Sequence, residues 1–255
     1  MELNLKMFII VCPLVFVAAI IDAIGGGGGL ISLPAFLFAG LPPHMAAATN
    51  KLSSSCGTTV VTARLVKNKL VDFKLAVPSV VLGIIGATTG AKLALLIPDR
   101  IFLNIMVVIL PVCAFFVLNK NLFNDNGSDE IEINRRTYIC AGISAFVVGM
   151  YDGLYGPGTG TFLIILFTVF AKMSIKKANG QAKVINLTSN ITSLIVFLLN
   201  GQVLIPLGLA AAVCNMAGGY IGAGLAIKNG SKITKPCIIL VLSILMIKII
   251  VETIG

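Results

Sequence analysis

The sequence predicts an all-α polytopic integral membrane protein made of two inverted structural repeats, each with four helices plus a glycine-broken segment. Three observations support this fold class. The 255 residues are 57% hydrophobic and 11% charged, and several apolar runs approach the roughly 20 residues that cross a bilayer. A glycine-rich break occurs twice, about 130 residues apart, and the basic loops fall at non-equivalent positions of the two halves.

The first half contains five apolar segments. They lie at roughly 5–24, 29–40, 45–63, 75–96 and 101–118. The first resembles the core of a signal peptide, but Lys6 is the only cation in its flank and Asp22 falls near where cleavage would occur, so we expect a transmembrane helix.

The run DAIGGGGGLISLP, from Asp22 to Pro34, interrupts the apolar sequence with five consecutive glycines. Each glycine costs about 1 kcal/mol in a helix relative to alanine, so five together predict a break. In hydrocarbon, freed backbone groups are tolerated only where protein buries them or where they line a wetted cavity. The break is therefore a candidate site, although glycines can also serve close helix packing alone.

The second half repeats the order of the first. Its apolar segments lie at about 137–152, 160–171, 178–199, 203–227 and 233–251, and its break is DGLYGPGTGT, from Asp152 to Thr161. A shift of about 132 positions places Lys51 on Lys183, Gly86 on Gly218 and Gly90 on Gly222. We therefore expect a first transmembrane repeat at 1–118, a polar cytoplasmic connector at 119–136 and a second repeat at 137–255. The small-xxx-small motifs at Gly86/Gly90 and Gly218/Gly222 could serve a homodimer as readily as internal packing.

Charge indicates that the repeats are inverted. The loop Arg64–Lys74 is strongly basic, whereas its counterpart 200–202 carries no charge. Conversely, Lys172, Lys176 and Lys177 have poor basic counterparts in the first half. By the positive-inside rule the copies then point in opposite directions, which requires an odd number of crossings. Five crossings result if each glycine stretch and the short helix after it make one broken crossing. The alternative is eight simple helices with re-entrant loops.

Several function classes are not indicated. The formal net charge of +9 is typical of cytoplasmic loops in a membrane protein, so we expect no nucleic-acid partner. The six cysteines lie in apolar segments without CxxC spacing or a partner histidine, which predicts neither a metal site nor a disulfide framework. No GxxxxGK[ST] string is present, and we expect no cofactor.

Inverted repeats with discontinuous helices are typical of secondary transporters, whose substrate binds near the membrane midplane. The short helices that open at about Leu30 and Thr161 would aim positive N-terminal ends into this region, which favours an anion. Lys51 and Lys183 lie at matching positions in apolar segments, and an intramembrane lysine marks a pathway unless it snorkels to an interface. Their polar neighbours are Thr49, Asn50, Ser53, Ser54 and Ser55 in one half and Gln181, Asn186, Thr188, Ser189 and Asn190 in the other.

Asp22 and Asp152 precede the two breaks at almost equivalent positions. Each is a candidate to accept a coupling proton or to pair with a lysine across the cavity, and the alternative role is to cap free amides at a helix end. Tyr151-Asp152 resembles the YD element of intramembrane aspartyl proteases, but the GxGD string that supplies their second aspartate reads Gly158-Thr-Gly-Thr161 here. An intramembrane aspartate-dependent enzyme and a passive anion channel remain the alternatives to a transporter.

The first break with its continuation, GGGGGLISLP and AAATNK, and the second, GPGTGTF, resemble the paired signature of the sulfite exporter TauE/SafE family of membrane permeases. The resemblance implies a multi-pass anion transporter of the cytoplasmic membrane, not an enzyme, that moves sulfite, sulfoacetate or sulfonates. It also implies a cavity formed around Gly25, Gly26, Gly27, Gly28, Gly29, Thr49, Asn50, Lys51, Gly156, Pro157, Gly158, Thr159 and Gly160.

The second copy departs from strict symmetry at the lysine register, where Asn50 meets Ala182. The polar role of Asn50 is therefore expected to pass to Gln181 or Asn186. The hypothesis is a secondary transporter in the lipid bilayer that moves a small sulfur-containing or organic anion by alternating access.

Overall fold

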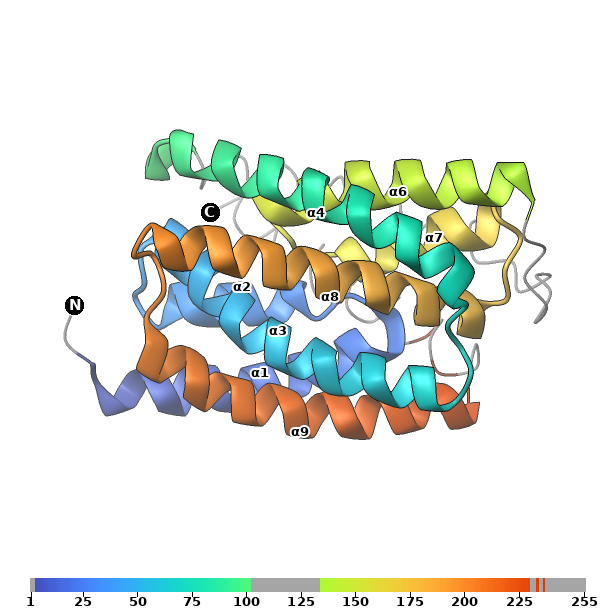
Figure 1. Cartoon of the computed structure of the whole chain (residues 1–255). Coiled ribbons are helices and arrows are strands. Elements are labelled where there is room, and N and C mark those ends of the chain that lie inside the picture. The colour runs from blue at the N-terminus through green and yellow to red at the C-terminus, as the bar shows by residue number, and fades with distance from the viewer. Residues whose placement is uncertain (1–2, 102–133, 230–232, 234–235, 237–255) are drawn as a thin grey trace, which may run out of the picture.

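The computed structural model of the chain describes residues 3–101, 134–229, 233 and 236. Nearly all of the segments expected at 101–118 and 233–251, and most of the connector expected at 119–136, lie outside these residues. The described part consists of α-helices joined by short turns (Figure 1). The helices are α1 Leu5–Gly25, α2 Gly29–Phe38, α3 Pro43–Lys67, α4 Phe73–Leu96, α6 Arg135–Leu154, α7 Thr159–Val169, α8 Ile175–Leu199 and α9 Ile205–Asn229.

Five of these helices are long and apolar enough to cross a membrane: α1, α4, α6, α8 and α9. Helix α3 is also 25 residues long, about 37 Å, but polar residues on its buried face lower its mean hydropathy. Large apolar side chains are exposed on the outer sides of α1, α4, α6 and α9, as expected of surfaces that face lipid. The prediction of a polytopic all-α membrane protein is confirmed.

Polar side chains fix where the long helices begin. The carboxylate of Asp72 accepts the backbone N–H groups of Lys74 and Leu75 at the start of α4, and Asn134 accepts the N–H of Thr137 at the start of α6. Ser174 accepts the N–H of Lys177 at the start of α8. Such caps satisfy amides that have no partner within the helix.

The two glycine breaks are shorter than the glycine runs that cause them. Helix α1 ends at Gly25, and the next residue, Gly26, caps it in the left-handed conformation with φ 77°. Helix α2 begins at Gly29. The second break covers residues 155–158, between α6 and α7. In Figure 1, α2 and α7 leave the middle of the bundle toward opposite ends.

The breaks cross each other at the centre of the bundle. A Cβ atom added to Gly160 would lie 2.5 Å from the Cα of Gly26, so the two backbones touch where neither residue has a side chain. The hydroxyl of Thr161, in the first turn of α7, donates to the carbonyl of Gly25, the last residue of α1, over 2.7 Å. This hydrogen bond joins the two helices directly beside their breaks. Close backbone approach therefore explains glycine at both positions.

The two halves of the chain pack through equivalent helix pairs. Helix α4 lies along α6, and α1 lies along α9. Gly86 and Gly90 of α4 face backbone carbonyls of α6, and a Cβ atom at either glycine would overlap them. Gly218 and Gly222 of α9 face carbonyls of α1 in the same way. Both small-xxx-small motifs are thus used for packing within this chain.

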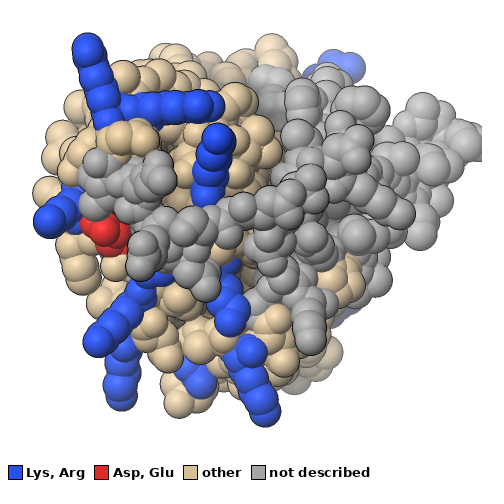
Figure 2. All heavy atoms as spheres, turned by 90° about the vertical axis from the view of Figure 1, so that its right-hand side faces the viewer, with Lys and Arg blue, Asp and Glu red and all other residues tan. Residues whose placement is uncertain are grey.

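Matching helices of the two halves run in opposite directions in Figure 1: α1 and α3 run from left to right, and α6 and α8 from right to left. The right-hand end of the bundle carries a basic surface, seen face-on in Figure 2, in which an acidic patch lies among many lysine and arginine side chains. Its exposed cations include Lys67, Lys69, Lys74, Arg135, Arg136, Lys172 and Lys228.

Candidate functional site

Two ion pairs connect the halves of the chain near the crossed breaks. Lys51 Nζ of α3 lies 2.8 Å from Asp152 Oδ2 of α6. Lys183 Nζ of α8 lies 2.5 Å from Asp22 Oδ2 of α1. Each pair therefore joins a lysine of one half to an aspartate of the other, so the two contacts are equivalents under the sequence repeat.

Both lysines are buried inside the bundle. The side chain of Lys51 is 5% exposed and that of Lys183 is 0% exposed. Each is the ninth residue of its helix, about 12 Å from the helix start, so neither amine reaches an interface along its own helix. A buried ammonium group requires a counter-charge, which the aspartates supply.

The pair formed by Lys51 and Asp152 is held by further hydrogen bonds. Lys51 also donates to Asn190 Oδ1 over 3.0 Å. The hydroxyls of Thr159 and Ser189 donate to the two oxygens of Asp152 over 2.7 and 2.5 Å. Charge-assisted bonds of this kind are stronger than neutral ones, and they fix the lysine and the carboxylate at the start of α7.

The pair formed by Lys183 and Asp22 is held differently. Asp22 accepts the backbone N–H of Gly28 over 3.3 Å, within the first break. Its side chain is 25% exposed, against 2% for Asp152. The two roles considered for Asp22, pairing with a lysine and capping a free amide, are thus combined in one side chain. The more exposed carboxylate lies at the first break and the enclosed one at the second.

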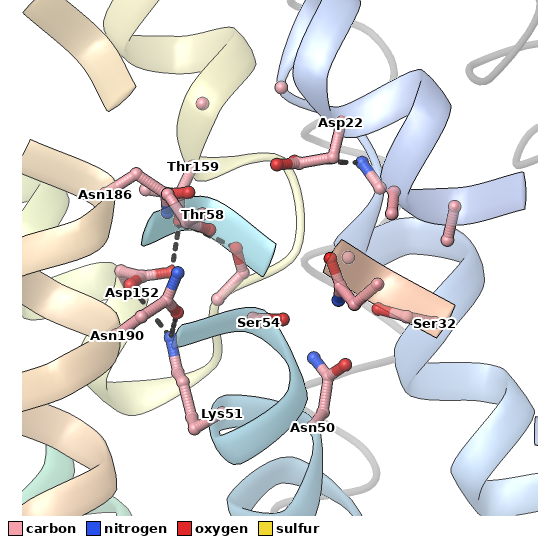
Figure 3. Close-up of a pocket in the computed structure, with 18 residues that line it drawn as sticks. Asp22, Ser32, Asn50, Lys51, Ser54, Thr58, Asp152, Thr159, Asn186 and Asn190 are labelled. Atoms are coloured by element: carbon pink, nitrogen blue, oxygen red, sulfur yellow. Dashed lines mark hydrogen bonds and ion pairs between the residues drawn. The ribbon is translucent and has the colours of Figure 1, made fainter. Parts of the chain in front are cut away.

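A pocket that opens to the surface lies between the two breaks. Figure 3 shows Lys51, Asp152 and Asn190 on one side of it and Asp22 and Ser32 on the other. The predicted residues whose side chains line it are Asp22, Asn50, Lys51, Asp152, Thr159 and Asn186. The predicted glycines that line it are Gly26, Gly28, Gly29, Gly156 and Gly160.

Other predicted site residues lie outside the pocket lining. They are Gly25, Gly27, Thr49, Pro157, Gly158, Gln181 and Lys183. The hydroxyl of Thr49 accepts the backbone N–H of Leu204, and the amide of Gln181 donates to the backbone carbonyl of Asp72, each over 3.0 Å. Consecutive helical residues point about 100° apart, so Thr49 faces the start of α9 while Asn50 faces the pocket.

The pocket also contains polar residues that the candidate set did not include. They are Ser32, Ser54, Thr58, Asn190 and Asn215. Asn215 donates to Ser53 over 3.1 Å and leaves no room for a side chain at Gly57. An asparagine in the middle of α9, among small apolar residues, is itself a signal of interior polar contact.

Helices α2 and α7 begin at Gly29 and Thr159, both of which line the pocket, so their partly positive N-terminal ends face it. Lys51 adds a full positive charge, which Asp152 balances. Within residues 3–101 and 134–229, no group of three or more His, Cys, Asp or Glu side chains is placed to hold a metal ion. The pocket thus combines the positive ends of two helices with a lysine that a carboxylate neutralises.

The two aspartates do not form a catalytic dyad in the described residues. Each carboxylate contacts a different lysine, and no hydrogen bond joins Asp22 to Asp152. Aspartic proteases instead hold two carboxylates close enough to share one proton. The geometry thus favours ion pairs over acid–base chemistry between these residues.

Comparison with known proteins places the chain within a family. A probable membrane transporter protein, ORF9, of Sinorhizobium sp is 32% identical over 93% of this chain and 90% of its own length. A probable membrane transporter protein of Haemophilus influenzae is 31% identical over 99% and 98%, and YfcA of Escherichia coli K12, also a probable membrane transporter protein, is 31% identical over 93% and 87%. No solved structure gives a significant match. The model of the sulfite exporter TauE/SafE family matches residues 11–249, and the chain belongs to that family.

Proposed function

We propose that this protein is a secondary transporter that moves a small sulfur-containing or organic anion across the cell membrane by alternating access. The observation that carries the proposal is the pair of buried lysine–aspartate bridges between the halves, at the crossing of two broken helices. Broken helices that meet at mid-membrane are the usual substrate site of secondary transporters. The relatives named as probable membrane transporters support the same class.

Lys51 is the proposed anion-binding residue. Its ammonium group lines the pocket and already contacts an oxyanion, the carboxylate of Asp152. A substrate sulfite, sulfonate or carboxylate presents the same oxygen geometry and can exchange with it. Because the attraction within a buried ion pair is largely offset by desolvation, such an exchange requires much less free energy than creating a new buried charge.

The bridges also suggest how transport could alternate. Each bridge spans the two halves, so movement of one half against the other must loosen or remake it. The two bridges occupy equivalent places but differ in exposure: Lys51 lines the pocket, whereas Lys183 is wholly enclosed. We infer that opening toward the other side of the membrane exchanges these environments, as the opposite directions of the matching helices suggest.

The basic surface of Figure 2 is the proposed cytoplasmic face. This orientation is tested with single cysteines in a background without the native ones. Lys69→Cys lies in the α3–α4 turn at the basic end, and Asn200→Cys lies in the α8–α9 turn at the opposite end. A membrane-impermeant maleimide should label Asn200→Cys in intact cells and Lys69→Cys only after lysis. Labelling of both from the same side would contradict the orientation.

Transport is tested in proteoliposomes that are supplied from outside with sulfite, sulfate, thiosulfate, sulfoacetate, taurine or propionate under an imposed ion gradient. We expect accumulation of one anion class against its gradient, which a passive channel cannot produce. Binding is measured separately by thermal shift, where an anion at about 100 times its dissociation constant should stabilise the protein by roughly 2.7 kcal/mol.

The matched variants are Lys51→Gln, in the pocket, and Lys74→Gln, on the exposed basic surface. Both remove one positive charge, but only the first should abolish anion binding and flux. Normal binding and flux in Lys51→Gln, or no response of the folded protein to any anion, would refute the assignment.

A further inference from the structure

We propose that Asn50 selects for an anion that also carries a hydrogen-bond donor, such as a hydroxy- or amino-substituted sulfonate or carboxylate, or a protonated oxyanion. This inference rests on the proposed anion transport and names the substrate class. Its basis is the side chain of Asn50, which lines the pocket next to Lys51 on α3.

The amide oxygen of Asn50 is buried, and in the described structure it has no hydrogen-bond partner. The residue as a whole is 9% exposed. In Figure 3 its amide points into the space between Lys51 and Ser32. Buried polar side chains in native proteins almost always have partners, so an unpaired amide that faces a pocket indicates a group supplied by the ligand.

The buried atom without a partner is the amide oxygen of Asn50, which accepts hydrogen bonds and cannot donate them. The amide nitrogen beside it carries two donor hydrogens. A fully deprotonated oxyanion offers acceptors only. It can accept from the Asn50 nitrogen but leaves the oxygen unpaired and cut off from water. A ligand with its own donor satisfies both atoms.

The position of Asn50 places this second contact beside the anion site. Asn50 and Lys51 both line this pocket, and because consecutive helical residues point about 100° apart, the amide and the ammonium group would contact one small ligand from different directions. The equivalent position in the other half is Ala182, which is fully buried and cannot hydrogen-bond through its side chain. The paired lysines and aspartates occur in both halves, whereas at the position of Asn50 only the first half has an amide. This asymmetry is expected of a residue that contacts one end of an asymmetric ligand.

The size of the effect follows from the cost of an unpaired acceptor. Leaving a buried donor or acceptor without a partner weakens binding by about tenfold to a hundredfold. The ligand with a donor should therefore bind at least about tenfold more tightly than its matched analogue without one.

Two probe pairs test this difference directly: ethanesulfonate against 2-hydroxyethanesulfonate, and propionate against lactate. Each pair differs by one hydroxyl group at nearly constant size and charge. Dissociation constants are measured by titration calorimetry for the full chain, for Asn50→Leu and for Asn200→Leu. Asn200 is an exposed asparagine in the α8–α9 turn, which makes it the matched control.

We expect the wild type and Asn200→Leu to prefer the hydroxylated probe by about tenfold or more. Asn50→Leu should bind both members of each pair equally. If Asn50→Leu does not fold, Asn50→Ala replaces it, and the comparison of probes on the wild type still stands alone.

Equal affinity of the wild type for both members of each pair overturns the inference, as does a preference that persists in the Asn50 variant. In both cases anion binding itself remains. If neither these probes nor sulfite binds to the folded wild type, the proposed anion transport fails, and the inference fails with it.

Discussion

The bridge between Lys51 and Asp152 should dominate the stability of the crossing region. Asp152→Asn keeps the shape of the side chain but removes its charge, and Lys51 is then left with Asn190 as its hydrogen-bond acceptor. Breaking a buried ion pair from one side costs about 3–5 kcal/mol, because the remaining charge is uncompensated. At about 2–4 °C per kcal/mol for a chain of this size, the melting temperature should fall by roughly 6–20 °C.

Removing the lysine should cost less than removing the carboxylate. In Lys51→Met, Asp152 still accepts hydrogen bonds from Thr159 and Ser189, which partly compensate its charge. The double variant has neither charge, so it should be more stable than Asp152→Asn alone. Its loss should be well below the sum of the two single losses.

The assay is thermal unfolding of the purified protein in one detergent, with Lys74→Met as the control. Lys74 is exposed, so its replacement should change stability by less than about 0.5 kcal/mol. Two results would refute the reasoning: single variants as stable as the control, or a double variant whose loss equals the sum of the single losses. Either would mean that the two side chains do not depend on each other.

Two further predictions concern glycines, each with a matched control and thermal unfolding as the readout. Gly26→Ala should destabilise the protein strongly, because a Cβ atom there overlaps Gly160, whereas Gly40→Ala places the same group at a positive φ with no atom within 4 Å; equal losses would show that φ alone matters. Gly86→Ala should cost about 1–3 kcal/mol because its Cβ atom meets a backbone carbonyl of α6, whereas Gly83→Ala, one turn earlier and 3.6 Å from its nearest neighbour, should be tolerated. Similar stability for these last two variants would contradict the close packing of α4 on α6.

Local chemistry made the helices of this protein predictable. Apolar length and the two glycine runs place the helices that the structure describes, with ends that differ by a few residues. The largest difference is at α3, which ends at Lys67 rather than near 63. Helix α8 begins at Ile175 rather than near 178, because the Ser174 cap lies before the apolar run.

The pairing of charges was less accessible from the sequence. The repeat shows that Asp22 and Asp152 are equivalent, as are Lys51 and Lys183, but it does not state which aspartate meets which lysine. That depends on how helices of different halves pack, which no local pattern encodes. Direction around a helix matters in the same way, since adjacent residues Thr49 and Asn50 face different neighbours.

The cross-connected bridges have a consequence for how the protein is made. When Lys51 enters the bilayer, its partner Asp152 still lies about 100 residues from being synthesised, and Asp22 waits longer for Lys183. At about 5–20 residues per second, the ribosome leaves this lysine without its counter-ion for roughly 5–20 s. A charged residue at the centre of a membrane helix costs about 2.5–3.5 kcal/mol on insertion scales. The first half alone therefore inserts into the bilayer less favourably than the complete chain. The charge of Lys51 is compensated only after the second half has been inserted, so a chain that stops before Asp152 should insert less stably than the full chain.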